Sequence, residues 1–290
     1  MSYRKILVPV FGSTHDRSAI QAAFGLAKQF GAHVEALFVR LDPVSRLPYG
    51  RPGDISGYAS QYAIEAAIKA ADEAQKIAQE SFDKIVDKYG VPVVAKPGAR
   101  PDASAEFKIV QGDFADEIER RSRICDLVVF GATSGDDEEL RSIREGFESA
   151  LLSGARPVLF VPRETTEIPG RRVAIAYDGS AAAAHAVTAA LPFLARAKEL
   201  HAFEATADKQ TTLTELQEYL ALHGLSAVEH VIDPGPKTTA EALLLAVAAQ
   251  KCDLLVLGGY GHSRIREFVL GGVTRHVLRH GTSLAVLMAH

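Results

Sequence analysis

The chain contains the same landmark twice, and this repeat constrains the possible folds more than any other feature. CDLVVFG at residues 125–131 returns as CDLLVLG at residues 252–258. A near-identical apolar segment in two places indicates duplicated structural units. Cys125 and Cys252 stand at equivalent positions before short apolar segments, so we interpret them as small buried side chains and not as a disulfide or a metal pair.

Other segments repeat in the same order on both sides of the chain. The matched pairs are KILVPVFGS (5–13) with RVAIAYDGS (172–180), HVEALFVRL (33–41) with ELHAFEATA (199–207), AEFKIVQGD with SAVEHVIDPG, and RPVLFVPR (156–163) with SLAVLMAH (283–290). Helical patterns separate them, at about 15–31, 58–89, 113–123, 181–199, 211–223, 237–251 and 271–280. The remaining segments 42–57 and 96–104 carry proline and glycine without periodicity and are predicted to be loops.

This alternation predicts the fold class. The apolar segments are continuous rather than alternating, which indicates parallel strands buried on both faces. Each half is therefore predicted to be a doubly wound, Rossmann-like α/β unit with a five-stranded parallel sheet. The polar linker ETTEIPGR contains Pro and Gly, so we place the two domains at residues 1–165 and 170–290.

Composition excludes several classes of protein. A net charge of -4 and a pI near 6.2 argue against a nucleic-acid-binding surface, which needs a concentrated basic face. The sequence contains no apolar segment of roughly 18 residues and does not open with a signal-peptide pattern, so we expect no membrane association. Two cysteines are too few for a disulfide framework and fit a reducing compartment. We therefore expect a cytoplasmic protein.

A glycine-rich segment, GGYGHSRIREFVLGG at 258–272, is the strongest functional signal. Ligands of open α/β sheets collect at the carboxyl ends of the strands, and this segment follows such a strand, as Asp178 does. Gly258 and Gly261 would let the backbone pass close to an anion, while Gly271 and Gly272 would present unobstructed N–H groups at the start of a helix. The pattern suits a polyphosphate, although neither a P-loop nor a GxGxxG fingerprint is present.

The second half resembles the universal stress protein family. Its nucleotide-binding members carry GxxGx9G followed by Ser or Thr, then Val and a hydroxyl residue, with an Asp after the first strand. The matching residues here are Asp178, Gly258, Gly261, Gly271, Val273 and Thr274. Gly272 replaces the Ser or Thr, which removes a hydroxyl but keeps the backbone N–H. The resemblance covers the whole chain as a tandem pair.

The first half lacks this motif. Phe11 replaces the Asp, the acidic run GDDEE occupies 135–139, and SIREGFESA at 142–150 stands where glycines should open a helix. Bulky and negative groups would repel a triphosphate. We therefore predict that the first half is a degenerate scaffold with an empty site.

The resemblance implies an ATP-binding protein with a regulatory or stress-response role, its adenine nucleotide held by the second half with or without Mg²⁺. It also implies that the last strands of the two halves lie side by side, so that one chain imitates a dimer, and further homo-oligomers remain open. We expect no catalytic residues. Two alternatives are slow ATP hydrolysis or autophosphorylation, and a nucleotide-independent adaptor that binds a partner through GDDEE or the first half's loops.

The cations that follow the glycines have two interpretations. His262, Arg264 and Arg266 can counter phosphate charge, or they can form a solvated face. Of these, His262 is included in the predicted nucleotide site.

Two other patterns are weaker. His276 and His280 have the spacing of a helical metal pair, but no third ligand accompanies them, so we favour a helix-surface role. Asp178, Ser180 and His185 supply the residue types of a hydrolase triad, yet no GxSxG elbow occurs and residues so close in sequence rarely converge properly. We reject this reading.

Overall fold

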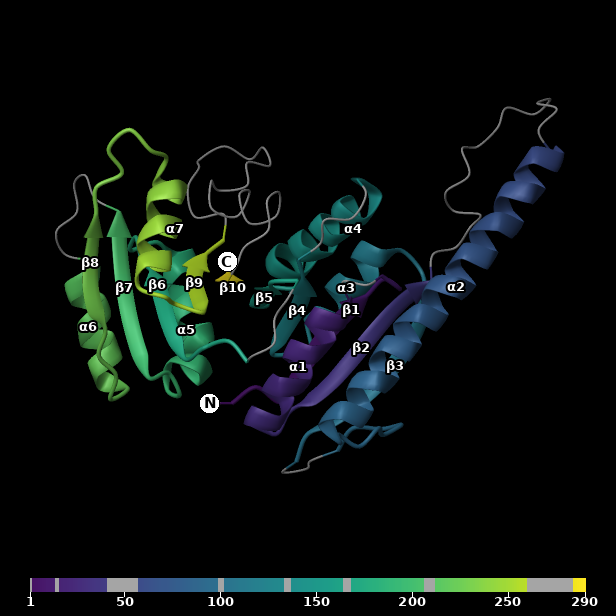
Figure 1. Cartoon of the computed structure of the whole chain (residues 1–290), viewed down its shortest axis with the longest axis horizontal. Helices are drawn as coiled ribbons and strands as arrows, with labels where there is room; N and C mark the ends of the chain where they lie inside the picture. Colours follow the sequence, from purple (N-terminus) through teal and green to yellow (C-terminus); the bar gives the residue numbers. More distant parts are fainter. Residues whose placement is uncertain are drawn as a thin grey trace.

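The structure is a computed structural model that describes residues 2–13, 16–40, 57–98, 102–132, 137–163, 168–205, 212–259 and 284–290. Strands and helices alternate along the chain, and a single sheet runs through the molecule (Figure 1). The predicted tandem α/β fold is confirmed.

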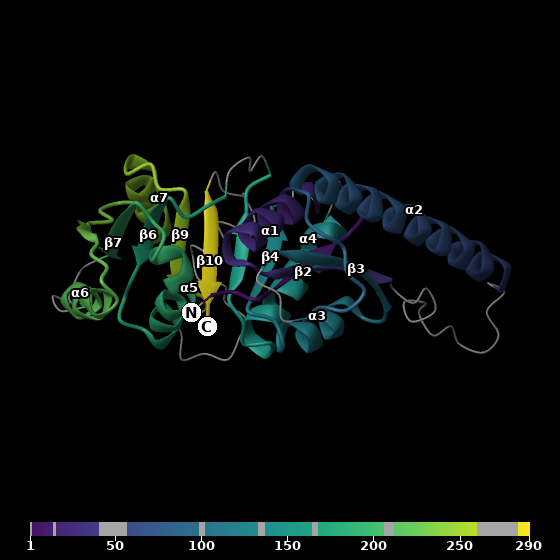
Figure 2. The ribbon, with the colours of Figure 1, turned by 90° about the horizontal axis from the view of Figure 1, so that it is seen from below.

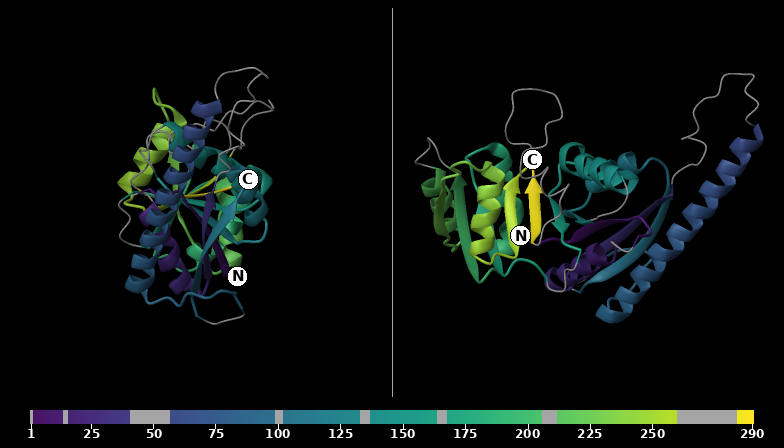
Figure 3. Two further views of the ribbon diagram at one scale, coloured as in Figure 1. Left: turned by 90° about the vertical axis from the view of Figure 1, so that its right-hand side faces the viewer. Right: turned by 45° about the horizontal axis from the view of Figure 1, so that its top comes forward.

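The first half follows the predicted order. Its strands are β1 (Lys5–Val10), β2 (His33–Arg40), β3 (Ser104–Gln111), β4 (Leu127–Gly131) and β5 (Val158–Val161). Its helices are α1 (Asp16–Phe30), α2 (Gly57–Tyr89), α3 (Phe114–Ser122) and α4 (Asp137–Glu148), followed by the π-helical turn η1 (Ser149–Ser153). One end of α2 projects well beyond the sheet (Figure 3). Helix α4 begins within the acidic run 135–139.

The second half repeats the scheme. Its elements are β6 (Arg172–Ala176), α5 (Ala181–Leu194), β7 (Glu199–Ala205), α6 (Thr212–Leu222), β8 (Val228–Ile232), α7 (Thr239–Ala249), β9 (Leu254–Gly258) and β10 (Ala285–Ala289). Helix α7 opens with a capping box, because the Thr238 hydroxyl accepts from the Glu241 N–H at 3.3 Å while the Glu241 carboxylate accepts from the Thr238 N–H at 3.0 Å. The predicted helix 271–280 lies outside the described residues.

The two halves share a 10-stranded sheet in the order β3-β2-β1-β4-β5-β10-β9-β6-β7-β8. Strands within each half pair in parallel, whereas β5 and β10 pair antiparallel at the centre, with Leu287 opposite Leu159 (Figure 2). The predicted side-by-side placement of the last strands is confirmed. Two separate five-stranded sheets would have left these apolar strands as exposed edges, and the antiparallel pair removes both edges.

Helices cover both faces of the sheet, as a doubly wound fold requires. Buried side chains of α1, α2, α5 and α6 pack on one face, and those of α3, α4 and α7 pack on the other. The continuous apolar pattern of the inner strands follows from this burial, since β1, β4, β5 and β9 are covered from both sides.

The outermost strands depart from the predicted burial on both faces. In β8, Val228 is 58% exposed and Val231 is 66% exposed. At the opposite edge, residues 92–94 bridge onto β3, where the Ala105 N–H donates to the Pro92 carbonyl at 3.0 Å. The prediction was wrong for the edges because an edge strand has a neighbour on one side only, so an apolar sequence there does not ensure burial.

The repeated Cys-Asp pair has a structural explanation. The Asp126 carboxylate accepts from the N–H groups of Arg4 and Lys5, at 2.7 and 2.9 Å, and so fixes the entry to β1. Asp253 does the same before β6, where it accepts from Gly170 and Arg171 at 3.0 Å and from Arg172 at 3.1 Å. Both cysteines beside these aspartates are buried free thiols, as predicted.

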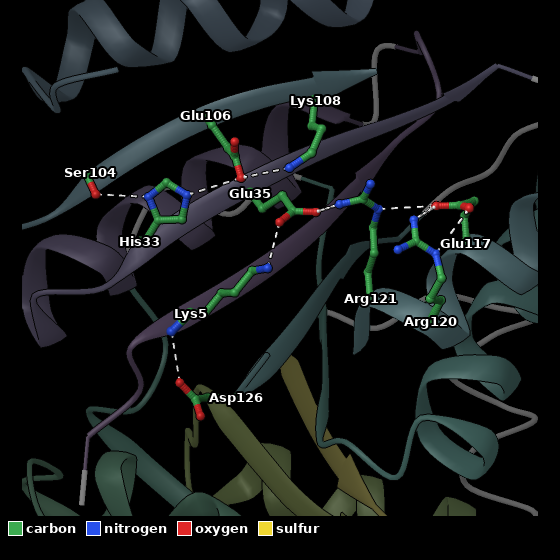
Figure 4. A network of polar contacts seen from close by, with 10 residues as sticks. All are labelled: Lys5, His33, Glu35, Ser104, Glu106, Lys108, Glu117, Arg120, Arg121 and Asp126. Atoms are coloured by element: carbon green, nitrogen blue, oxygen red, sulfur yellow. Dashed lines mark hydrogen bonds and ion pairs between the residues drawn. The ribbon is translucent and has the colours of Figure 1, made fainter. Parts of the chain in front are cut away.

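A buried ion network attaches α3 to the first half's sheet (Figure 4). Glu35 on β2 is 1% exposed, and its carboxylate forms ion pairs with Lys5 Nζ at 2.7 Å and with Arg121 Nη1 at 2.5 Å. Arg121 also contacts Glu117 at 3.3 Å. Beside this network, His33 lies 2.9 Å from the Ser104 hydroxyl and 3.5 Å from Glu106. A buried carboxylate needs such pairing, because desolvating an unpaired charge is costly.

Candidate functional site

The candidate site lies where β6 and β9 end side by side, with Ala176 opposite Leu257 in the last paired register. The turn after β6 brings Asp178 to this edge, and its carboxylate accepts from the Ser180 N–H at 2.9 Å. The Ser180 hydroxyl in turn caps α5 by accepting from the Ala183 N–H at 3.2 Å. The sequence forms a tight turn here because the Asp178 and Ser180 side chains accept backbone N–H groups that a strand-to-helix junction exposes, while Gly179 supplies the positive φ.

Gly179 is required by this turn. Its φ is +76°, in the left-handed region, and an added Cβ would lie 2.9 Å from Thr212 Cγ2 at the start of α6. The Thr212 hydroxyl donates a hydrogen bond to the buried carboxylate of Glu204, at the end of β7. The turn therefore packs directly against the β7 and α6 junction.

Gly258 ends β9 against the first turn of α5. An added Cβ would lie 2.6 Å from the Ala183 backbone nitrogen and 2.8 Å from the Ala182 carbonyl carbon. The missing side chain thus permits close packing of strand and helix, a role that the glycine spacing alone did not reveal. The predicted clearance for an anion at this position stays a prediction.

Gly259, at the start of the glycine-rich segment, is held by both halves of the chain. Its N–H donates to the Ala289 carbonyl at 2.8 Å, and its own carbonyl lies 3.0 Å from His290 Nδ1. An added Cβ would lie 2.8 Å from Leu151 Cδ2, which comes from η1 in the first half. The sequence carried no signal for Leu151 or His290, because the first reaches Gly259 across the two halves and the second through the β9–β10 pairing.

Most of the predicted nucleotide site lies outside the described residues. This holds for Gly261, His262, Gly271, Gly272, Val273 and Thr274, as it does for Arg264, Arg266, His276 and His280. Their roles stay predictions. Of the predicted set, the structure brings together Asp178 and Gly258, which both border the first turn of α5.

The residues of the rejected triad have other partners. The Ser180 hydroxyl accepts the helix-capping hydrogen bond, and His185 Nδ1 lies 3.0 Å from the His290 backbone oxygen. These contacts explain both side chains structurally, as an N-cap and as a link between α5 and the end of β10.

The strand-end region around Asp178 is acidic. Burial raises the pKa of the Tyr177 phenol, and the nearby carboxylates of Glu215 and Asp178 raise it further. Buried Glu204 adds another carboxylate at the end of β7. Carboxylate oxygens accept hydrogen bonds from hydroxyl and amino groups and repel phosphates, so this side of the site suits a sugar or a base.

In the first half the corresponding turn is filled by the chain's own groups. The buried Asp16 carboxylate accepts from the N–H groups of Phe11, Gly12 and Ser13 at 2.9, 2.7 and 3.2 Å. Gly12 has a φ of +77°, and an added Cβ would lie 2.2 Å from the Ala74 carbonyl oxygen of α2. The Phe11 ring packs on Phe114 at 4.9 Å between centroids. This turn therefore has its amides satisfied and a helix against it.

The described part of the chain contains neither a metal-ligand cluster nor a membrane-spanning helix. There, no group of three or more His, Cys, Asp and Glu side chains is arranged to hold a metal ion. No helix among the described segments combines the length and apolar character needed to cross a bilayer.

A duplicated, doubly wound sheet with a candidate ligand site at its strand ends defines a class of tandem Rossmann-like proteins. A profile of the "Universal stress protein family" matches residues 2–155 and 170–289. The chain belongs to the universal stress protein family.

Relatives agree with this assignment. Universal stress protein Slr1230 of Synechocystis sp. (strain ATCC 27184 / PCC 6803 / Kazusa) is 32% identical over 152 residues, which is 48% of this chain and 49% of that protein. The chain thus spans about half the length of this curated relative.

Among solved structures, a universal stress protein from Archaeoglobus fulgidus DSM 4304 matches with a TM-score of 0.67 and 17% identity, covering 99% of this chain and 96% of that one. The functionally unknown protein PA1789 from Pseudomonas aeruginosa PAO1 matches with a TM-score of 0.55 and 15% identity, covering 99% and 92%. At these identities the likeness shows the fold alone, and it extends over both halves.

Proposed function

We propose that this chain is a cytoplasmic adenine-nucleotide-binding regulator with a stress-response role, and that its second half holds one ATP. The observation that carries the proposal is the meeting of two motif residues at one edge: Asp178 and Gly258 end neighbouring strands and both border the first turn of α5. Asp178 and Gly258 are far apart in the sequence, so only the pairing of β6 with β9 brings them to one edge. The family motif continues directly from Gly258.

The two sides of the site divide the ligand between them. The acidic region of Asp178, Glu204 and Glu215 suits the hydroxyl and amino groups of a nucleoside. The glycine-rich segment supplies the phosphate contacts: backbone N–H groups at Gly261, Gly271 and Gly272, the hydroxyl of Thr274 after Val273, and the charge of His262. Charge-assisted hydrogen bonds from such groups contribute about 1.5–3 kcal/mol each, so the N–H that Gly272 retains compensates in part for the hydroxyl it lacks.

The first half serves as a scaffold in this proposal. Asp16 already occupies the amides of the turn after β1, and α2 packs on Gly12. A phosphate placed there would meet a buried carboxylate and the backbone of a helix. One chain therefore binds one nucleotide, and the paired halves form an internal pseudo-dimer.

Titration calorimetry of the full chain with ATP, with and without Mg²⁺, tests the proposal. We expect one ATP per chain and, for Gly271→Asp, at least a tenfold loss of affinity, equivalent to about 1.4 kcal/mol. Gly98→Asp is the matched control, since an added Cβ at Gly98 meets nothing within 4 Å; its affinity should equal that of the wild type.

Three outcomes would contradict parts of the proposal. Unchanged ATP affinity in Gly271→Asp would remove the assignment of the glycine-rich segment. Two ATP molecules per chain would overturn the scaffold role of the first half. No ATP binding by the wild type would leave the nucleotide-independent adaptor as the function. Phosphate release that disappears in Gly261→Val would add slow hydrolysis to the binding role.

A further inference from the structure

A second hollow lies between the two halves, at the opposite end of β6 from Asp178. It has a volume of about 630 Å³, within the range of small-molecule sites. The last turns of α1, the linker before β6 and the segment after α5 line it. We call it the junction pocket. It therefore draws on both domains and is separate from the candidate nucleotide site.

Among the described residues that line the junction pocket, every charged side chain is a cation. Its charged lining residues are Lys28, Arg171, Arg196 and Lys198, all exposed. Lys28 Nζ donates to the Tyr89 carbonyl at 3.1 Å, and the Arg196 guanidinium lies 6.0 Å from the centre of the Phe30 ring. Within the described ranges none of the four forms an ion pair. The described lining of the pocket thus contributes about four positive charges.

Neighbouring carboxylates are occupied elsewhere. Asp253 accepts from the N–H groups of Gly170, Arg171 and Arg172. Glu199 pairs with Arg172 at 2.7 Å and flanks Lys198 only in sequence. These contacts hold the backbone beneath the pocket in place, and Asp253 is not among the described lining residues.

Helix dipoles account for part of the cluster. Lys28 lies in the last turn of α1 and Arg196 follows the end of α5, and the negative end of a helix dipole favours cations at such positions. The same reason does not apply to Arg171, which precedes β6, or to Lys198, which precedes β7. Four like charges around one hollow repel one another, and an anion between them reverses that repulsion.

We propose that the junction pocket binds a small anion carrying two or more phosphate groups. Two guanidinium groups can each pair with phosphate oxygens in bidentate fashion, and two ammonium groups add point charges, so the four together offset about the charge of a pyrophosphate. Because α1 belongs to the first half and the segment after α5 to the second, the bound anion connects the two domains.

Calorimetric titration of the full chain with sodium pyrophosphate, without added ATP, tests this proposal. The wild type should bind one pyrophosphate at low salt, and more weakly as the salt concentration rises. The variant Lys28→Gln, Arg171→Gln, Arg196→Gln, Lys198→Gln should bind at least tenfold more weakly. These exposed positions should leave thermal unfolding within a few degrees of the wild type.

The matched control replaces four exposed lysines outside the pocket: Lys69→Gln, Lys84→Gln, Lys96→Gln and Lys237→Gln. It has the same net charge as the pocket variant and should bind pyrophosphate as the wild type does. Equal loss in both variants would show a diffuse charge effect and overturn the proposal, as would no binding by the wild type. Loss of pyrophosphate binding in Gly271→Asp, with the pocket intact, would place the anion at the glycine-rich segment instead and also overturn it. None of these results depends on whether ATP binding itself succeeds.

Discussion

The two halves contain the same strand-to-helix turn, but different groups surround it. After β1, the Asp16 carboxylate accepts three backbone N–H groups and α2 packs against Gly12. After β6, the equivalent turn carries Asp178, and Gly179 faces the side chain of Thr212. The difference teaches that a duplicated fold can keep its sheet while one copy satisfies its strand-end amides with its own carboxylate.

A second contrast concerns one buried position in the sheet. Glu35 on β2 and His201 on β7 occupy equivalent places. Glu35 is paired with two cations, whereas His201 Nδ1 lies 3.0 Å from His230 Nε2 on the edge strand β8. The first half therefore relies on a buried ion network where the second relies on a pair of imidazoles.

The largest predicted effect tests this second contrast. Glu35→Gln leaves Lys5 and Arg121 without their buried carboxylate and should lower the free energy of unfolding by about 3–5 kcal/mol. His201→Gln, which loses one hydrogen bond, should lower it by about 1 kcal/mol. Urea unfolding of both variants at neutral pH measures the difference, and equal losses would contradict it.

The same variant should change the response to acid. Burial alone would raise the pKa of Glu35, but the hydrogen bonds and charges of Lys5 and Arg121 outweigh it and hold that pKa below its usual value. A carboxylate with a lowered pKa stabilises the fold above its unfolded pKa, about 4.3, and loses this contribution as the pH falls through the folded value. Between about pH 5 and pH 3, the wild type should lose stability more steeply than Glu35→Gln.

The next prediction compares the two turns. Gly12→Ala places a Cβ 2.2 Å from the backbone oxygen of Ala74, which α2 holds in place, and should cost about 3 kcal/mol in stability. Gly179→Ala has nearly the same φ but meets the Thr212 methyl group at 2.9 Å and no backbone atom within 4 Å, so it should cost about 1–2 kcal/mol. If thermal or urea unfolding gives the reverse order, α2 does not close the first turn.

A smaller effect should cross from one half to the other. Leu151 is 1% exposed and packs on Gly259, whereas its neighbour Leu152 is 37% exposed. Leu151→Ala should lower stability by about 2–3 kcal/mol and weaken ATP binding about fivefold, because it loosens the start of the glycine-rich segment. Leu152→Ala is the control and should leave ATP affinity unchanged. Equal ATP affinities in Leu151→Ala and Leu152→Ala would show that packing from the first half does not affect ATP binding by the second.

The smallest contrast concerns the repeated cysteines. Burial raises the pKa of Cys125 to about 12 and that of Cys252 to about 11. At pH 8 both thiols should react with a disulfide reagent at least about a hundredfold more slowly than a free cysteine, since the thiolate is the reactive form. Cys252, assayed in the Cys125→Ser variant, should react about tenfold faster than Cys125 in Cys252→Ser.

The sequence was sufficient for the fold because the relevant signals are local. Repeated apolar segments and helical periodicity located the strands and most of the described helices to within a few residues, and the family resemblance implied the central β5–β10 pair. Burial of the edges was not predictable in this way, since the composition of β8 does not say whether another strand lies beside it.

The candidate site was less accessible to sequence reasoning. Asp178 was predicted because its residue type and place after a strand are local signals. Asp16 was missed, although it closes the first turn, because its contacts depend on how α1 approaches β1. Leu151 reaches Gly259 only through the junction of the two halves, and His290 reaches it through the pairing of β9 with β10. Long-range packing of this kind leaves no periodic pattern in a single sequence.

The central antiparallel pair also determines an order of events during synthesis. Val158–Val161 leaves the ribosome before the entire second half, yet its partner is Ala285–Ala289. Until that partner arrives, a fully apolar strand presents unpaired backbone groups, a surface that can join the same strand of another nascent chain. Completion of the second half is thus what protects the first from premature association.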